Sequence, residues 1–190
     1  EILIGLVGSE MCIRDSIYMR QFVAKIILFL VILFLVDTAL GICFQTLVDS
    51  AKGGETRRVN YICKQTSEDL LIFGSSRALH HYDPLLLEDS LQMSCYNCGK
   101  DGNGIILLYG WFKMIQQRYH PQMIVYDVMP NFDLWKGDNM AYLPGLRYYY
   151  GESAVDSIFW SVDKNERFKM MVQSYRFNSQ FLQIMMDNIK

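Results

Sequence analysis

Residues 69–76, DLLIFGSS, decide the fold that this sequence predicts. The short apolar run stops abruptly at Gly74, Ser75 and Ser76. This pattern is typical of a buried parallel strand followed by a tight turn. A helix can begin at Arg77, directly after the turn.

The same alternation of strand and helix continues downstream. Asp83 suits the N-cap and Pro84 the first position of a helix, which indicates a helix over 84–91. The remaining elements are predicted from apolar runs, helical spacing and glycine-rich breaks. They are a strand over 93–96 (MSCY), a loop over 97–104 (NCGKDGNG), a helix over 104–119, a strand over 123–128 (MIVYDV) and a loop over 129–133 (MPNFD).

Strands that alternate with helices indicate an α/β fold with a parallel sheet. In such sheets the functional site lies beyond the carboxyl ends of the strands. Three predicted loops follow those ends, at 74–76, 97–104 and 129–133. We therefore expect these loops to meet at one edge of the sheet.

The three loops resemble the conserved blocks of the SGNH (GDSL-like) hydrolase superfamily. Its first block is a G-x-S turn, and Gly74-Ser75-Ser76 puts Ser76 at the nucleophile position. Gly102 matches the glycine of the second block. Asn131, in Pro130-Asn131-Phe132-Asp133, matches the asparagine of the third, although the flanking glycine and following aspartate of that block are altered. The resemblance covers about residues 69–133 and implies a three-layer, flavodoxin-like sheet of SGNH type.

Residues 73–84, FGSSRALHHYDP, also resemble the first block of bacterial envelope proteins that modify exopolysaccharide or cell-wall polymers by acyl transfer. This resemblance implies an extracytoplasmic serine esterase or O-acyltransferase that acts on an envelope glycan. A serine hydroxyl needs a base to become a good nucleophile. The amides of Ser76 and Gly102 and the side chain of Asn131 would supply the oxyanion donors.

Each of these residues also has a plainer interpretation. Ser75 and Ser76 can be turn residues or helix caps, and Ser75 can be the nucleophile in place of Ser76. Gly102 can be a turn glycine and Asn131 a capping residue. His80 and His81 follow Ser76 on the same predicted helix, so we interpret them as surface or packing residues, with a possible substrate contact for one.

Two further residues, His120 and Arg77, lie near the ends of predicted elements. His120 precedes Pro121 at the opposite end of a helix, on the wrong side of the sheet. Arg77 can contact an anionic substrate or simply be solvated, and we favour the solvated arginine. The stretch 135–176 is rich in Tyr, Phe and Trp, which suits either a glycan groove or core packing.

The superfamily takes its base from a late D-x-x-H block, and no such block occurs in these 190 residues. Asp187 is followed by Asn188, Ile189 and Lys190, so the role is not carried over to it. We expect a truncated domain over 69–190 with little or no turnover. The alternative is a degenerate, non-catalytic glycan-binding or scaffolding subunit of an envelope assembly.

The N-terminal part predicts a membrane anchor. Residues 1–16 resemble the translation of sequencing-adapter DNA, so 1–18 is interpreted as an artefactual leader. The apolar segment over 19–48 is long enough for a transmembrane helix, and Arg20 and Lys25 place its N-terminus in the cytoplasm. A cleavable signal peptide is the rival interpretation. The polar stretch 49–68 is interpreted as a linker.

Composition narrows the remaining possibilities. The formal net charge is -2 and there is no basic stripe, so nucleic acid is not expected as a partner. Cys95 and Cys98 have C-x-x-C spacing, but no second pair of ligands follows for a zinc site. We interpret the two cysteines as small residues in and after a buried strand, and we expect no cofactor or metal.

Overall fold

The structure is a computed structural model of the chain. It describes the backbone of residues 2–134 and 143–189 and the side chains of residues 18–130, 133–134 and 143–189. The chain divides into two compact units, Glu1–Leu40 and Gly41–Lys190.

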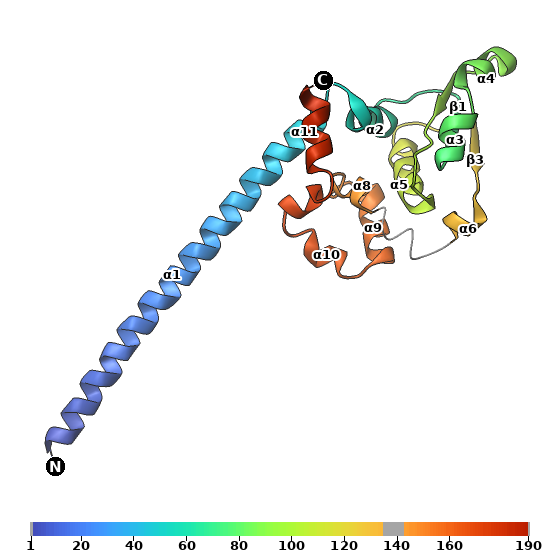
Figure 1. The fold of residues 1–190 in the computed structure, drawn as a ribbon. Coiled ribbons are helices and arrows are strands. Elements are labelled where there is room, and N and C mark those ends of the chain that lie inside the picture. The colour runs from blue at the N-terminus through green and yellow to red at the C-terminus, as the bar shows by residue number, and fades with distance from the viewer. Residues whose placement is uncertain (1, 135–142, 190) are drawn as a thin grey trace. The chain divides into compact units, whose positions relative to one another are not determined.

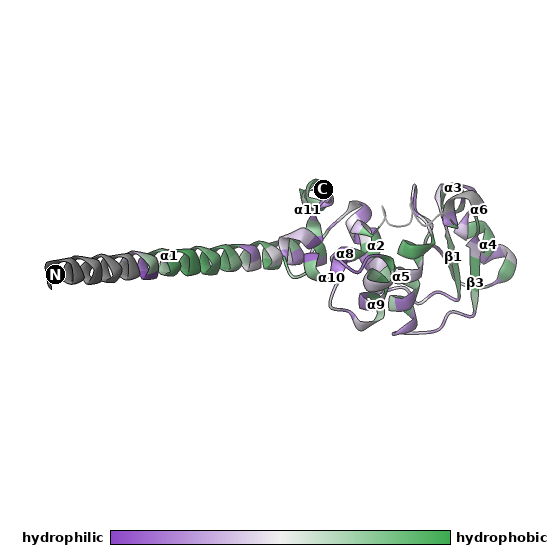
Figure 2. Ribbon diagram, turned by 90° about the horizontal axis from the view of Figure 1, so that it is seen from below, coloured by the Kyte–Doolittle hydropathy of each residue, from purple (hydrophilic) through white to green (hydrophobic). Residues whose placement is uncertain are grey.

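The first unit is helical throughout its described length. It belongs to α1 (Ile2–Asp49), and the stretch Tyr18–Asp49 is long and apolar enough to cross a membrane. Figure 2 shows the continuous run of hydrophobic residues in this helix. Side chains over 18–36 are all exposed, which a buried core helix would not allow. The predicted apolar helix is confirmed, and it is compatible with a membrane anchor or a signal sequence.

The second unit contains a three-stranded parallel sheet (Figure 1). Its strands are β1 (Leu70–Gly74), β2 (Cys95–Asn97) and β3 (Met123–Asp127), in the order β2-β1-β3. The three strands lie within one or two residues of their predicted bounds. The central strand β1 comes from the stretch DLLIFGSS, and all five of its residues are buried.

Helices cover both faces of the sheet. Side chains alternate between the two faces along β1, so both sets of its side chains are buried. Leu70 and Ile72 pack with Ala78 and Cys95 on the face that carries α3 (Ser76–His81) and α4 (Pro84–Leu91). Leu71 and Phe73 join the larger core on the other face, with α5 (Ile105–Gln116). The Asp83 carboxylate accepts a hydrogen bond from the Leu85 amide at 3.0 Å, as its predicted N-cap role requires. The fold is therefore α/β, as predicted.

The stretch 49–68, which we predicted to be a linker, instead contains a helix of the core. This helix, α2 (Gly54–Lys64), buries Val59, Ile62 and Cys63 against the main cluster. Its apolar residues are spaced along one helical face and are separated by charged residues, so the stretch is polar on average but amphipathic in space.

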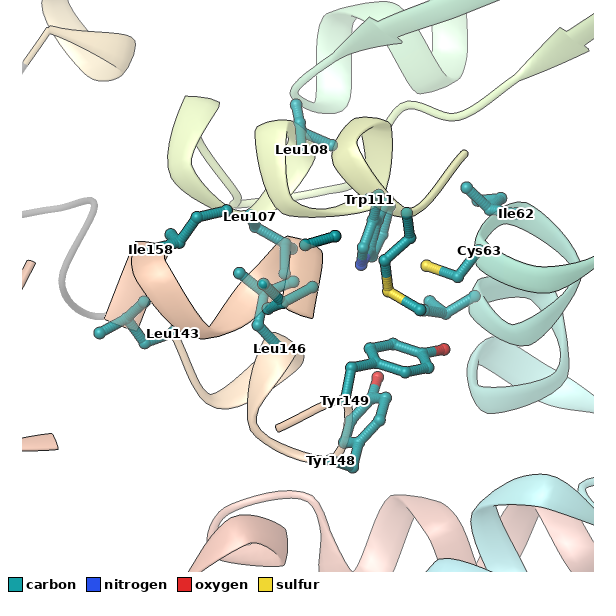
Figure 3. Packing of buried hydrophobic residues seen from close by; sticks show 14 of the residues in the cluster. Ile62, Cys63, Leu107, Leu108, Trp111, Leu143, Leu146, Tyr148, Tyr149 and Ile158 are labelled. Atoms are coloured by element: carbon teal, nitrogen blue, oxygen red, sulfur yellow. The ribbon is translucent and has the colours of Figure 1, made fainter. Parts of the chain in front are cut away.

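The C-terminal region packs on α2 and α5 as a group of short helices (Figure 3). Leu107 and Trp111 of α5 meet Leu146, Tyr148 and Tyr149 in this core. The buried tyrosines show that this part of the aromatic stretch has the packing role. These helices are α8 (Pro144–Arg147), α9 (Ser153–Val162), α10 (Glu166–Lys169), the 3-10 helix η1 (Ser174–Phe177) and α11 (Phe181–Ile189). The short helix α6 (Pro130–Asp133) instead lies at the end of β3 (Figure 1).

Asp187 has a structural task in this domain. Its carboxylate is buried and accepts hydrogen bonds from the Thr56 amide at 2.9 Å and from Gln183 Nε2 at 2.8 Å. The first bond satisfies one of the free amides at the start of α2. Any side chain at Gly54 would collide with this carboxylate. Asp187 therefore fastens α11 to α2.

Candidate functional site

The three predicted loops follow neighbouring strands at the carboxyl edge of the sheet. The Lys100 amide donates to the Gly74 carbonyl at 3.0 Å, which holds the loop after β2 beside the turn after β1. On the other side of β1, Gly74 pairs in register with Asp127, the last residue of β3. The turn that contains Ser75 and Ser76 thus leaves the sheet between the ends of β2 and β3.

Gly74 makes the sharp turn possible. Its φ is +149°, a conformation that L side chains rarely adopt. A Cβ at this position would lie 2.6 Å from Ala78 Cβ and 3.0 Å from Asp127 Cβ. The missing side chain therefore lets α3 fold back directly over the end of the strand.

The two serines of the turn have opposite surroundings. Ser75 is the N-cap residue of α3 and is only 4% exposed. Ser76 is the first residue of α3 and is exposed. Ser76 is therefore open to solvent, whereas Ser75 is covered.

Gly102 lies in the loop between β2 and α5, and it is exposed. Its φ is +63°, and no atom lies within 4 Å of where its Cβ would be. The loop itself is firmly held, because Asn97 Nδ2 donates to the Ala78 carbonyl at 2.8 Å and Asn97 Oδ1 accepts from the Gly99 amide at 2.9 Å. A backbone amide in such a loop has a defined position.

Asn131 lies in α6, directly after the loop that leaves β3. Its side chain is outside the described residues. The same turn is capped by Asp133, whose carboxylate accepts from the Met129 amide at 2.8 Å and from the Tyr126 hydroxyl at 3.0 Å. Burial and the nearby Asp133 charge raise the pKa of Tyr126, so this hydroxyl stays protonated as a donor.

Arg77 is exposed, as predicted, but its guanidinium also pairs with Asp127, which was not predicted from the sequence. Its guanidinium donates hydrogen bonds from two nitrogens to the Asp127 carboxylate, and the Nε to Oδ2 distance is 2.7 Å. It also donates to the Val128 carbonyl at 3.1 Å. These hydrogen bonds lower the pKa of Asp127 and raise the pKa of Arg77. The sequence signal for this pair was Asp127, a charged residue at the end of an otherwise apolar strand, because a buried carboxylate needs a cationic partner.

His80 is also paired. Its Nε2 lies 2.9 Å from Asp101 Oδ1, which joins α3 to the loop that contains Gly102. Both side chains are more than half exposed, so the pair contributes little to stability. His81 is exposed, as expected for a surface residue.

The two cysteines of the C-x-x-C motif are buried in and after β2. Burial raises the pKa values of both thiols, most strongly for Cys98. A thiol held in its protonated form is a poor nucleophile and a poor metal ligand. Their surroundings are those of small core residues.

A polar pocket of about 360 Å³ lies beside Gly102. The β2–α5 loop contributes Lys100, Gly102 and Asn103 to its wall. The other lining residues belong to α2, to α8 and its C-terminal neighbour, and to the segment at the start of α11: Glu55, Thr56, Pro144, Gly145, Tyr148, Ser179, Gln180 and Gln183. Sequence reasoning missed this pocket, because its residues come from four separate parts of the chain.

No protein-family model, curated protein or solved structure matches the chain.

Proposed function

We propose that the complete protein is an extracytoplasmic serine esterase or O-acyltransferase of SGNH type that acts on a cell-envelope glycan. The observation that carries this proposal is the exposed Ser76 at the start of α3, directly after the central strand. The order β2-β1-β3 also occurs at the start of flavodoxin-like sheets, whose ligands bind where the strand order reverses, between the ends of β1 and β3. Ser76 leaves the sheet at that point.

The chemistry assigned to these residues is acyl transfer. The Ser76 hydroxyl oxygen attacks the carbonyl carbon of an ester, and its proton passes to a general base. The amides of Ser76 and Gly102 and the Asn131 side chain would stabilise the oxyanion, and one such donor is typically worth about 2.7–4 kcal/mol. The alcohol leaves with a proton, and water or a sugar hydroxyl then takes the acyl group from Ser76.

The base is expected in the D-x-x-H block that the resemblance implies, and that block does not occur in residues 1–190. The proposal therefore concerns the product of the complete gene. The apolar helix Tyr18–Asp49 would anchor the protein as a single pass. Arg20 and Lys25 on its N-terminal side favour a cytoplasmic N-terminus and an external domain.

Hydrolysis of p-nitrophenyl acetate by the complete gene product tests the proposal. We expect turnover, an acetylated Ser76 peptide in mass spectra of the quenched reaction, and loss of both in Ser76→Ala. Ser75→Ala is the matched control, because the neighbouring hydroxyl is covered. Unchanged activity in Ser76→Ala would remove the proposal.

A second candidate function is a non-catalytic glycan-binding or scaffolding subunit. It is favoured by the surroundings of Ser76, since no hydrogen bond to its hydroxyl is present within the described part of the chain. A complete gene without a D-x-x-H block, together with saccharide binding and no turnover, would support this candidate.

A further inference from the structure

The pocket beside Gly102 has the size of a small-ligand site. Its volume of about 360 Å³ falls within the usual range for such sites, roughly 300–1,000 Å³. Its walls come from α2, the β2–α5 loop, α8 and the start of α11, all of which belong to the second compact unit. The loop that supplies Gly102 is fixed to α3 by Asn97, so this wall is built in advance of binding.

The two charged residues described in the pocket wall are paired with each other. Glu55 and Lys100 are its charged lining residues among those described, and Lys100 Nζ lies 2.7 Å from Glu55 Oε1. The same carboxylate oxygen also lies 3.4 Å from Arg58. An anionic or cationic ligand would have to break this pair, whereas a neutral ligand can leave it intact.

The remaining polar groups suit hydroxyl groups. Asn103 Nδ2 donates to the Asp101 carbonyl and Gln183 Nε2 donates to Asp187, which leaves the amide oxygen of each residue as an acceptor. No hydrogen bond from the Gln180 side chain occurs within residues 18–130, 133–134 and 143–189, so its amide offers both donors and an acceptor. A hydroxyl group both donates and accepts, and it can therefore satisfy each of these groups.

The pocket also has an apolar component. Pro144 and Tyr148 line it, and the Tyr148 ring is packed against Tyr149 with ring centroids 4.7 Å apart. A wall that combines apolar residues with side-chain amides matches a molecule that carries both C–H groups and hydroxyls. We infer that this pocket binds one neutral sugar ring of a saccharide. As a substrate subsite, this inference rests on the proposed function; as a binding site, it stands without Ser76.

Ligand-observed saturation-transfer NMR on the full chain tests the inference. The chain is held in phosphocholine micelles, because a detergent with a sugar headgroup would compete. Maltose and N,N′-diacetylchitobiose are the neutral probes, and glucuronate is the anionic comparison. We expect saturable binding of at least one neutral probe and a weaker response to glucuronate.

Gln180→Leu removes the unsatisfied amide and keeps a similar volume, so it should weaken that binding about fivefold. Gln65→Leu is the matched control, because Gln65 is an exposed glutamine outside the pocket. An unchanged thermal unfolding midpoint in both variants shows that neither substitution disturbs the fold. Equal binding by the two variants, no saturable binding of either neutral probe, or a preference for glucuronate would overturn the inference.

Ser76→Ala separates this inference from the proposed function. If the complete protein with Ser76 in place binds saccharide but has no esterase activity, or if Ser76→Ala keeps both properties, the pocket inference stands and the acyl-transfer proposal is removed. Esterase activity without saccharide binding at the pocket would support the acyl-transfer proposal and overturn the pocket inference.

Discussion

Asp127, at the end of β3, accepts hydrogen bonds from two nitrogens of Arg77, the residue that follows Ser76. The Arg77 side chain therefore ties the first turn of α3 to the neighbouring strand. Asp127 is almost fully buried and Arg77 is about half exposed. This tie sets where Ser76 sits relative to the loop after β3.

Arg77→Lys should slow acylation of Ser76 more than it weakens substrate binding. Lysine keeps the positive charge but cannot make a two-nitrogen contact with the Asp127 carboxylate. We expect kcat to fall about tenfold with little change in KM, as for a loss of about 1.4 kcal/mol in positioning. Steady-state p-nitrophenyl acetate hydrolysis by the complete gene product measures this. An equal loss in Lys113→Arg, on α5, would show that the effect is not specific to this contact.

Ser75→Ala should be neutral or stabilising. The Ser75 hydroxyl is buried without a hydrogen-bond partner among the described residues, and such a group is unfavourable by about 1–3 kcal/mol. Chemical denaturation should give an unfolding free energy equal to or above that of the parent. A clear loss of stability would indicate a hydrogen bond to this hydroxyl and contradict its assignment as a buried turn residue.

Gly74→Ala and Gly102→Ala should differ sharply. At Gly74 the new methyl group meets Ala78 and Asp127 as well as an unfavourable φ, so we expect a loss of about 3 kcal/mol or more. At Gly102 the methyl group enters open space, and only the φ of +63° opposes it, at about 1–2 kcal/mol. Urea unfolding of the two variants compares them directly. Equal losses would contradict the close approach of α3 to the end of β1.

The buried Arg147–Glu166 pair predicts a specific pH dependence of stability. Burial alone would raise the pKa of Glu166, but hydrogen bonds from Arg147 and Lys169 outweigh it, and the pKa is lowered. The stability from this group is therefore present above the ordinary glutamate pKa of about 4.3 and lost as pH falls through the lower folded value.

Arg147→Met removes one of three partners of Glu166 and should weaken this dependence. Lys169 Nζ and the Tyr175 hydroxyl each still lie 3.0 Å from Glu166 Oε1, so the carboxylate stays partly compensated while its pKa rises toward the ordinary value. The variant should be less stable than the parent near neutral pH and should lose less stability than the parent as pH falls from about 6 to about 3. Thermal unfolding across this pH range is the measurement. A variant with the parent's pH profile would show that the pair does not govern Glu166.

The sheet and its flanking helices were largely predictable, because each arises from local sequence. DLLIF is a short apolar run that stops at Gly74, which favours a buried strand, and Asp83-Pro84 supplies the residues preferred at the N-cap and first position of a helix. Helix α2 was missed, since the buried Val59, Ile62 and Cys63 are spread among charged residues and only a partner surface reveals their common face. The assignment of Ser76, Gly102 and Asn131 to catalysis remains a prediction.

The sequence by itself determined the alternation of strands and helices, the apolar N-terminal helix and the Gly-Ser-Ser turn, because hydrophobic spacing and backbone preference act over a few residues. Only the tertiary structure decided that Arg77 pairs with Asp127, that Asp187 caps α2, and that Gly102 borders a polar pocket. Those contacts join residues tens of positions apart. Their partners are chosen by how the packed elements bring charges and amides together, which no local pattern encodes.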